Sequence, residues 1–213
     1  MLCSDVMAAI RRTLNDEDKV TFPDSVVLAA LNEALSALVL YRADASATTS
    51  VVQLAPGTRQ SIPADGIRLI RLIRNRGSDG VQVGRSIRLV DTDVMDAIAP
   101  GWHQLSGNYV AEYTYDPHTP KEFYVYPAVP SGTVYVELSY SRNIPEAAAN
   151  DTLPVDAIYS QALKEWALYV LWGGDTDSSP NYSQAIGRKQ TFFDLLQVKS
   201  ASDKATYPAI KGQ

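Results

Sequence analysis

The spacing of the apolar residues changes twice along this chain, and that change limits the possible folds more than any other feature. Apolar residues recur every three or four positions from about residue 4 to residue 42, mostly alternate from residue 49 to residue 140, and return to the helical spacing from residue 154 to residue 199. One element cannot serve both periods, because a helix repeats about every 3.6 residues and a strand about every 2. The sequence therefore predicts two helices, a strand-rich section and then two more helices.

The two N-terminal helices differ in how much apolar surface they carry. The first is predicted over residues 4–15 with Ser4 as its cap, and the second over residues 24–42 with Asp24 as its cap. Because the second helix is apolar on almost every side, we expect it to be buried at the centre of a bundle or to face another subunit as well. Its polar stripe consists of Asn32, Glu33 and Ser36.

The middle section predicts strands separated by turn signals. A first strand turns at Pro56-Gly57 and returns through Ile62. Residues 67–74 form a further β-prone run. Asp91 is placed to cap a short helix, which Pro100-Gly101 ends.

A hairpin is the clearest strand prediction in the second half of this section. Residues 123–126 and 133–140 alternate apolar and polar side chains, with a turn at Pro130-Ser131-Gly132 between them. One face of the hairpin should therefore point into the core. That face carries Phe123, Val125, Val134, Val136 and Leu138.

The two C-terminal helices follow a connector of small residues. The first of them is predicted to open at Pro154 and to end at Gly173-Gly174, and the second to open at Ser179-Pro180. The periodicity is lost after Lys199, so residues 200–213 are predicted to be an extended tail. The inward faces are expected to consist of Val155, Ile158, Ala162, Trp166 and Tyr169 on the first helix, and of Tyr182, Ile186, Phe193 and Leu196 on the second.

These elements predict an α+β fold. The N- and C-terminal helix pairs, residues 1–48 and 153–198, are short individually and are expected to pack as one four-helix bundle. An antiparallel β-domain, residues 49–152, is inserted between the pairs, and residues 199–213 form an extended C-terminal arm. A chain of 213 residues is long enough for this two-part arrangement.

The charge balance and the cysteine count exclude some classes of function. The formal net charge is −5, whereas a tight nucleic-acid binder usually carries a basic excess, because phosphate neutralisation supplies most of its affinity. The single cysteine, Cys3, allows no intrachain disulfide and favours a reducing compartment such as a bacterial cytoplasm. Residues 26–41 are interpreted as too short and too polar to span a bilayer, so no membrane partner is expected.

No set of residues in the sequence predicts catalysis, cofactor binding or a metal site. His103 and His118 lie in loop-like sequence without neighbouring acid–base or ligand partners. Asp91, Asp93 and Asp96 cluster at a helix start, where carboxylates interact favourably with the helix dipole without a metal. The sequence contains no phosphate-binding glycine loop and no nucleophile elbow. We therefore expect no enzyme activity.

Arginine is concentrated in one strand-rich stretch. Arg68, Arg71 and Arg74 recur every three residues, so on a regular strand they cannot share one face. Two interpretations stay open: salt bridges on solvated edges of the chain, or pairing with carboxylates of a neighbouring subunit or partner ring. The same stretch includes Arg59, Arg76, Arg85 and Arg88.

Tyrosine is the second excess, because five of the twelve tyrosines lie between Tyr109 and Tyr126. Outward tyrosines on strands are frequent at protein interfaces, but tyrosine is also an ordinary β-former. Together with the arginines, they give a candidate subunit or tail interface. Its candidate residues are Arg68, Arg71, Arg74, Arg85, Arg88, Tyr113, Tyr115, Tyr124 and Tyr126.

Three ordered phrases in the middle of the chain resemble one known family. They contain Gly57-Thr58-Arg59-Gln60 before Ile62-Pro63, then Pro100-Gly101-Trp102, and then Phe123–Pro127 preceded by Asp116. In this order and spacing the phrases look like those of the head-to-tail adaptor proteins of tailed bacteriophages, which include the tail-tubular A type. The resemblance covers residues 2–196.

The resemblance implies a structural virion protein. Such an adaptor forms a ring of about twelve copies under the portal at the capsid vertex and connects it to the tail or nozzle. Genomic DNA passes through its lumen without specific binding. The resemblance also implies that the protein is made in the host cytoplasm and resides in the virion neck. In this family the helical part and the C-terminal segment commonly dock on the portal, which here makes Tyr207, Pro208 and Ile210 the expected anchors, and residues 77–88 and 113–126 are expected to face the tail.

Other interpretations stay open from the sequence. The chain could be another neck component, such as a nozzle or head-completion protein, although a nozzle protein should be larger and richer in β-structure. It could also be a cytosolic scaffold, unrelated to phage, that binds protein through its tyrosine-rich face. A hydrolase with an unrecognised site is a further alternative, which the lack of a convergent catalytic set disfavours.

Overall fold

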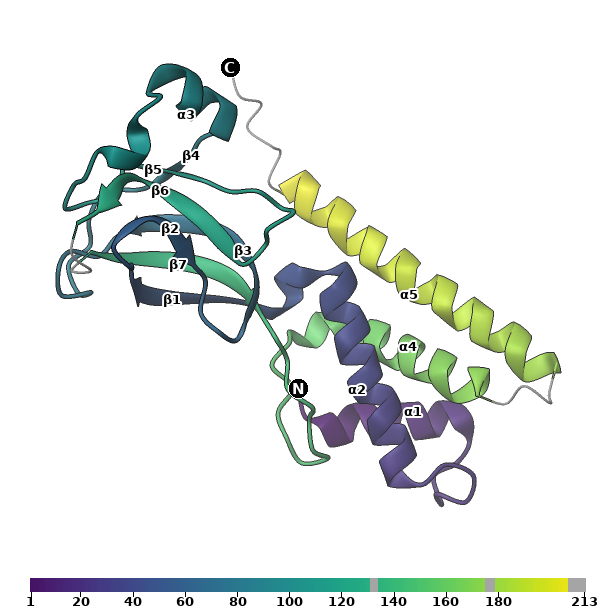
Figure 1. Cartoon of the computed structure of the whole chain (residues 1–213). Helices are drawn as coiled ribbons and strands as arrows, with labels where there is room; N and C mark the ends of the chain where they lie inside the picture. The colour runs from purple at the N-terminus through teal and green to yellow at the C-terminus, as the bar shows by residue number, and fades with distance from the viewer. Residues whose placement is uncertain (131–133, 175–178, 207–213) are drawn as a thin grey trace. The chain divides into compact units, whose positions relative to one another are not determined.

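The computed structural model describes residues 1–130, 134–174 and 179–206, and the chain divides into two compact units (Figure 1). A helical unit comprises Met1–Ala45 and Ile144–Gln213, and a β-rich unit comprises Ser46–Asn143. Helices and strands are thus largely segregated, and the predicted α+β class is confirmed.

The helical unit is built around helix α4 (Ser160–Gly173). Helices α1 (Cys3–Leu14), α2 (Asp24–Tyr41) and α5 (Ser179–Thr206) each pack against it. These contacts establish α4 as the shared neighbour, and the four-helix bundle stays a prediction. Side chains buried in the core of this unit include Ile10, Leu31, Leu35, Leu163, Leu168 and Phe192.

A buried carboxylate organises the turn between α1 and α2. Asp16 accepts hydrogen bonds of 2.9 Å from the backbone amides of Val20, Thr21 and Phe22. Arg11 donates a further bond of 3.2 Å to the same carboxylate. The amides, that of Thr21 foremost, lower the pKa of Asp16 against the opposing effect of burial. The turn therefore depends on an ionised aspartate.

The predicted caps of the first two helices are wrong. Leu2 occupies the capping position of α1 without a side-chain cap, so Ser4 lies inside the first turn. Helix α2 follows Pro23, and Asp24 uses its carboxylate in an ion pair of 2.7 Å with Arg11 instead. The pair links α1 to the start of α2.

Helix α2 is the core helix that its composition predicts. It packs against α1 and α4, while Leu40 at its C-terminal end is 77% exposed. By length and composition alone, α2 is long enough and apolar enough to cross a membrane. The interpretation of this stretch as too short and too polar was therefore wrong. Its packing inside the helical unit accounts for its apolar composition without a membrane.

Helix α4 begins later than predicted. Pro154 does not open it, because a 3-10 turn over Ala157–Tyr159 comes first. Asp156 caps that turn by accepting a hydrogen bond of 2.9 Å from the amide of Ile158. The predicted end of the helix at Gly173 is confirmed.

The predicted buried faces of α4 and α5 are confirmed only in part, at Ala162 and Leu196. On α5, Phe192 is fully buried, whereas Tyr182 and Ile186 are 57% and 52% exposed. Ile158, expected to be inward, is also exposed. Both helices carry apolar residues on more than one stripe, so the helical period is compatible with two possible buried faces for each helix. The contact between the two helices determines which of these faces is buried. The face that α4 buries includes Ala162, Leu163, Ala167, Leu168 and Leu171.

Helix α5 continues to Thr206, so the first part of the predicted extended arm, residues 199–206, is helical. A regular apolar face is not required there, because alanine and lysine are good helix formers and Lys199 pairs with Asp203 one turn later. Asp203 also pairs with Arg42 at 2.9 Å. The predicted anchors Tyr207, Pro208 and Ile210 lie outside the described residues.

The β-rich unit consists of two sheets that share one core. Its strands are β1 (Ala47–Gln53), β2 (Gly57–Ser61), β3 (Gly66–Asn75), β4 (Arg88–Leu89), β5 (Glu112–Thr114), β6 (Glu122–Val129) and β7 (Tyr135–Arg142). The sheet orders are β1-β7-β3 and β2-β6-β5-β4, and of the pairings between these named strands only that of β4 with β5 is parallel. An isolated bridge between Ser106 and Ala128 is also parallel. Inward side chains from both sheets form the core, among them Leu72, Phe123, Val125 and Leu138.

The predicted hairpin is wrong, and the strands on either side of the first turn do not pair either. Strands β1 and β2 flank the turn at Pro56-Gly57 but belong to different sheets, and so do β6 and β7. The predicted inward face is nevertheless confirmed, since Phe123, Val125, Val136 and Leu138 are all buried. Alternation identifies the inward face, and a hairpin or a crossing between two facing sheets buries the same residues. Only the tertiary structure distinguishes the two connections.

The short helix α3 (Thr92–Ile98) is confirmed, together with its cap. The carboxylate of Asp91 accepts a hydrogen bond of 2.9 Å from the amide of Asp93. Trp102, in the 3-10 turn Trp102–Gln104, is buried and donates from Nε1 to the carboxylate of Asp96 at 2.8 Å. Capping and packing thus account for this acidic cluster.

Candidate protein-binding surface

Successive β-bulges place the arginines of β3 on one face of its sheet. The register of β3 against β7 shifts after Gly66, after Leu69 and after Leu72, so that three residues of β3 span two of β7. Alternate residues of β7 share a face, and the arginines lie opposite such residues. The sequence argument against a single stripe assumed a regular strand and was wrong. The pairs are Arg68 with Ser141, Arg71 with Ser139, and Arg74 with Glu137.

The same bulges keep the inward residues of β3 in line. Leu69, Leu72 and Asn75 are each at most 5% exposed. They lie opposite Tyr140, Leu138 and Val136, which are the inward residues of β7. One face of β3 therefore carries a row of arginines and the other a row of buried side chains.

The arginines divide into paired and unpaired ones. Arg74 and Arg76 lie 3.3 and 3.6 Å from the carboxylate of Glu137. By contrast, Arg68 and Arg71 are exposed, and among the described residues no carboxylate lies within ion-pair distance of either. Salt bridges inside the chain thus account for only part of the arginine excess. Other contacts are Arg59 with Glu122, Arg88 with Glu112, and Arg85 over the ring of Tyr109 at 5.5 Å.

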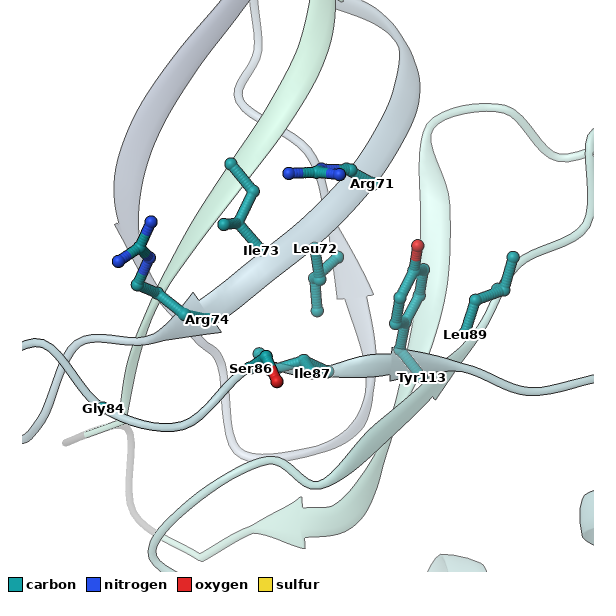
Figure 2. Close-up of a pocket in the computed structure, with 9 residues that line it drawn as sticks. All are labelled: Arg71, Leu72, Ile73, Arg74, Gly84, Ser86, Ile87, Leu89 and Tyr113. Atoms are coloured by element: carbon teal, nitrogen blue, oxygen red, sulfur yellow. The ribbon is translucent and has the colours of Figure 1, made fainter. Parts of the chain in front are cut away.

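A pocket of about 450 Å³ lies beside β3 (Figure 2). Figure 2 shows Arg71 and Arg74 on β3 and Tyr113 on β5 at its border. Its lining contains two guanidinium groups, several apolar side chains and no carboxylate, which suits a protein segment that carries an acidic residue beside an apolar one. The lining residues are Arg71, Leu72, Ile73, Arg74, Gly84, Ser86, Ile87, Leu89 and Tyr113.

A buried amide holds one wall of this pocket. Asn75 donates from Nδ2 to the carbonyl oxygens of Val110 at 2.7 Å and Arg85 at 3.1 Å, and its Oδ1 accepts from the amide of Val110 at 2.8 Å. Its carbonyl oxygen also accepts from the amide of Gly84 at 2.8 Å. These bonds fix the segment after β3 and the segment before β5 to the end of β3. Sequence reasoning missed Asn75, although its place in the same three-residue repeat as Leu69 and Leu72 was a signal.

The four candidate tyrosines differ in exposure. Tyr113 is 4% exposed and belongs to the core, so it is not the surface residue that the sequence predicted, and burial raises the pKa of its hydroxyl. Tyr115 is partly buried and donates to a backbone carbonyl at 3.3 Å, and burial raises its pKa as well. Tyr124 and Tyr126 are partly buried and meet the ring of Trp102 edge-on.

The described residues contain no group of three or more metal-ligating side chains placed to hold an ion. His103 stacks on Trp102 with a centroid distance of 3.7 Å, and exposed His118 bonds with Asp116 at 2.9 Å. Cys3 is buried, and burial raises the pKa of its thiol, which keeps the thiol protonated. These groups make local contacts within the chain.

A family model described as SU10 adaptor protein matches residues 1–211 of the chain. No curated protein matches it. The matched range includes the arginine row, the pocket and the three predicted C-terminal anchors, and it includes residues from both units.

Proposed function

The chain belongs to the SU10 adaptor protein family, and on this premise we propose that it joins the portal at the capsid vertex of a tailed bacteriophage to the tail or nozzle. The family is one of structural adaptors of the phage neck, which confirms the resemblance found in the sequence. In this proposal the protein forms a ring of about twelve copies, through whose lumen the genomic DNA passes without specific binding. It is made in the host cytoplasm and acts in the virion neck.

The family match across both units carries the proposal. A match to one unit would leave the role of the other open, whereas residues 1–211 include both. A structural adaptor needs surfaces for protein contact rather than reacting groups, and the arginine row and its pocket supply such a surface. The net charge of −5 also suits a channel that DNA must pass, because negative charge repels the phosphates.

We assign the contacts with the tail, and one side of the contact with a neighbouring subunit, to the β-rich unit. Residues 77–88 and 113–126 are the tail-facing candidates, with Arg85 and Arg88 as their charged groups. The partly buried rings of Tyr115, Tyr124 and Tyr126 add aromatic surface to this assignment. Tyr113 is left out, because its side chain is in the core.

We assign portal docking to the C-terminal arm. Because residues 199–206 are helical, we place the docking contact in residues 207–213, which lie outside the described residues. Its apolar anchors are Tyr207, Pro208 and Ile210. The helical unit, whose four long helices we propose to act as one bundle, carries this arm.

Removing residues 207–213 tests the docking assignment while keeping every described residue of α5. A deletion from Ser200 would be less clean, because it would remove Asp203 and its ion pairs with Arg42 and Lys199. The full-length chain and the chain that ends at Thr206 would each be mixed with the purified portal of the same phage and imaged by electron microscopy. Tyr207→Ala/Ile210→Ala tests the anchors, and Lys211→Ala is the matched control.

The full-length chain and the control should add a ring to the portal. The shortened chain and the anchor variant should leave the portal bare while keeping the circular dichroism spectrum of the full-length chain. A ring formed by the shortened chain would refute the docking arm and leave the adaptor role intact. A full-length chain that ignores an intact portal would refute portal joining itself.

A further inference from the structure

Arg68 and Arg71 are exposed cations with regular spacing, and neither forms an ion pair with a carboxylate among the described residues. They lie opposite Ser141 and Ser139 on β7, which places them about 7 Å apart along the strand direction. An arginine guanidinium binds a carboxylate with two parallel hydrogen bonds. Two neighbouring carboxylates on another surface would therefore complement this pair.

Most carboxylates in the described residues already serve the chain. They form ion pairs, as Glu137 does with Arg74, or accept hydrogen bonds from backbone amides, as Asp91 does, or from side chains, as Asp96 does. Others lie in the first turn of a helix, where the dipole stabilises them. The described carboxylates without any of these roles are Glu17, Asp18, Glu33 and Glu146.

Glu33 and Glu146 line one groove of about 450 Å³ on the helical unit. Asn32 of α2 fixes the two sides of this groove, since its side chain donates to the carbonyl oxygen of Ala147 at 3.2 Å and accepts from the amide of Ala147 at 2.8 Å. Both glutamates are exposed. Leu28 and Asn32 also line the groove, and its other lining residues are small enough to let long side chains approach; these are Ser25, Ala29 and Ser36.

We propose that Arg68 and Arg71 of one copy dock on the groove of Glu33 and Glu146 of a second copy. The inference rests on the proposed ring and names one contact between its neighbours. A closed ring requires two different, complementary patches on each copy. The arginine pair is on the β-rich unit and the glutamate groove is on the helical unit, so the chain carries two such patches of opposite charge.

Charge complementarity at this contact fixes the relative position of the two copies more than it raises their affinity. Exposed ion pairs contribute little stability on their own, but a misplaced neighbour would bring like charges together or leave the arginines unpaired. The association should therefore weaken as the salt concentration rises, because salt screens exposed charges. The apolar wall of the pocket that Arg71 borders would supply buried area.

Charge reversal tests the contact in a way that misfolding cannot imitate. Two full-length variants are needed, Arg68→Glu/Arg71→Glu and Glu33→Arg/Glu146→Arg, with Glu17→Arg/Asp18→Arg as the control that reverses the unpaired acids outside the groove. Self-association is measured by sedimentation velocity for each chain alone and on the purified portal, and then for an equimolar mixture of the two test variants. In the mixture every contact between unlike neighbours is again between opposite charges.

Each test variant should associate more than about tenfold more weakly than the wild type, and the mixture should recover wild-type association. The control should associate as the wild type does. Wild-type association of either test variant, or failure of the mixture, overturns the inference. A wild-type chain that binds the portal without contacting its neighbours overturns it too but leaves portal joining intact. If Arg68→Glu/Arg71→Glu changes only the binding of duplex DNA, the arginines face the lumen and the inference is wrong.

Discussion

Replacing Asn75 by alanine tests how the wall of the pocket beside β3 is held. The change removes two hydrogen bonds donated by Nδ2 and one accepted by Oδ1. It leaves the carbonyl oxygen and the amide of Val110 without this partner in a buried place, whereas the carbonyl oxygen of Arg85 is only partly buried and still accepts from the backbone amide of residue 75 at 3.0 Å. At about 1 kcal/mol for each bond, the loss approaches 3 kcal/mol. Because water can enter the vacated space and satisfy part of these groups, we expect Asn75→Ala to lower the free energy of unfolding by about 2–3 kcal/mol.

Two measurements separate a local from a general effect of this variant. Urea titration followed by circular dichroism gives the change in unfolding free energy, and hydrogen exchange gives the opening of individual amides. The amide of Val110 should exchange about 30- to 150-fold faster, which corresponds to the same free energy. Asn108→Ala, at an exposed asparagine, is the matched control and should be neutral. A loss below about 1 kcal/mol with unchanged exchange at Val110 would refute the role given to Asn75.

Three further predictions concern backbone space, protonation and a buried charge. Gly66→Ala should lower the unfolding free energy by about 1–3 kcal/mol in urea titration, because a Cβ there would lie 2.9 Å from a backbone carbonyl oxygen. Gly187→Ala in α5 has open space around the added Cβ and should raise the unfolding free energy by up to about 1 kcal/mol. The pKa of Asp16 is lowered in the folded protein, so ionised Asp16 contributes fully to the free energy of unfolding above its ordinary pKa of 3.8. This contribution is lost as the pH falls below that value. In an acid titration of unfolding, the Asp16→Asn variant should not show this loss. Arg188→Ala leaves the buried carboxylate of Glu165 without its partner at 3.0 Å and should cost about 2–3 kcal/mol by thermal or urea unfolding, part of which Glu165→Gln should recover.

The helical period located the long helices better than it located their buried faces. The predicted start of α2 at Asp24 and the end of α4 at Gly173 are confirmed, since turn residues and glycine mark helix ends in the sequence. The face of α5 was predicted only in part, because Phe192 and Phe193 adjoin and either could anchor an apolar stripe. Leu196 is buried as predicted, whereas Tyr182 and Ile186 are exposed. The structure buries Phe192 completely and leaves Phe193 partly exposed. Which stripe is buried depends on the neighbouring helix, and the apolar periodicity of one helix carries no information about its neighbour.

The strands show the same limit in another form. The alternation around Phe123 and Val136 identified inward residues correctly, because both sheets bury their inward faces in one core. Partner choice depends on long-range pairing, and β6 joins β2 and β5 while β7 joins β1 and β3. A short connection between two strands favours a hairpin but does not require one. For the same reason, no local sequence pattern could predict which arginine pairs with which carboxylate.

The row of arginines on β3 could have been predicted from the sequence if the three-residue spacing of the arginines had been taken as evidence about the strand. On a regular strand with Arg68 outward, Arg71 would point inward and Leu72 outward. That arrangement buries an unpaired guanidinium and exposes a leucine, at a cost of several kcal/mol. A bulge in each repeat avoids both penalties, because it adds one residue to β3 for every two residues of β7. A polar–apolar repeat of three inside a β-prone run is therefore evidence for repeated bulges. What the repeat cannot supply is the position of Glu137, which pairs with Arg74 and leaves Arg68 and Arg71 for another partner.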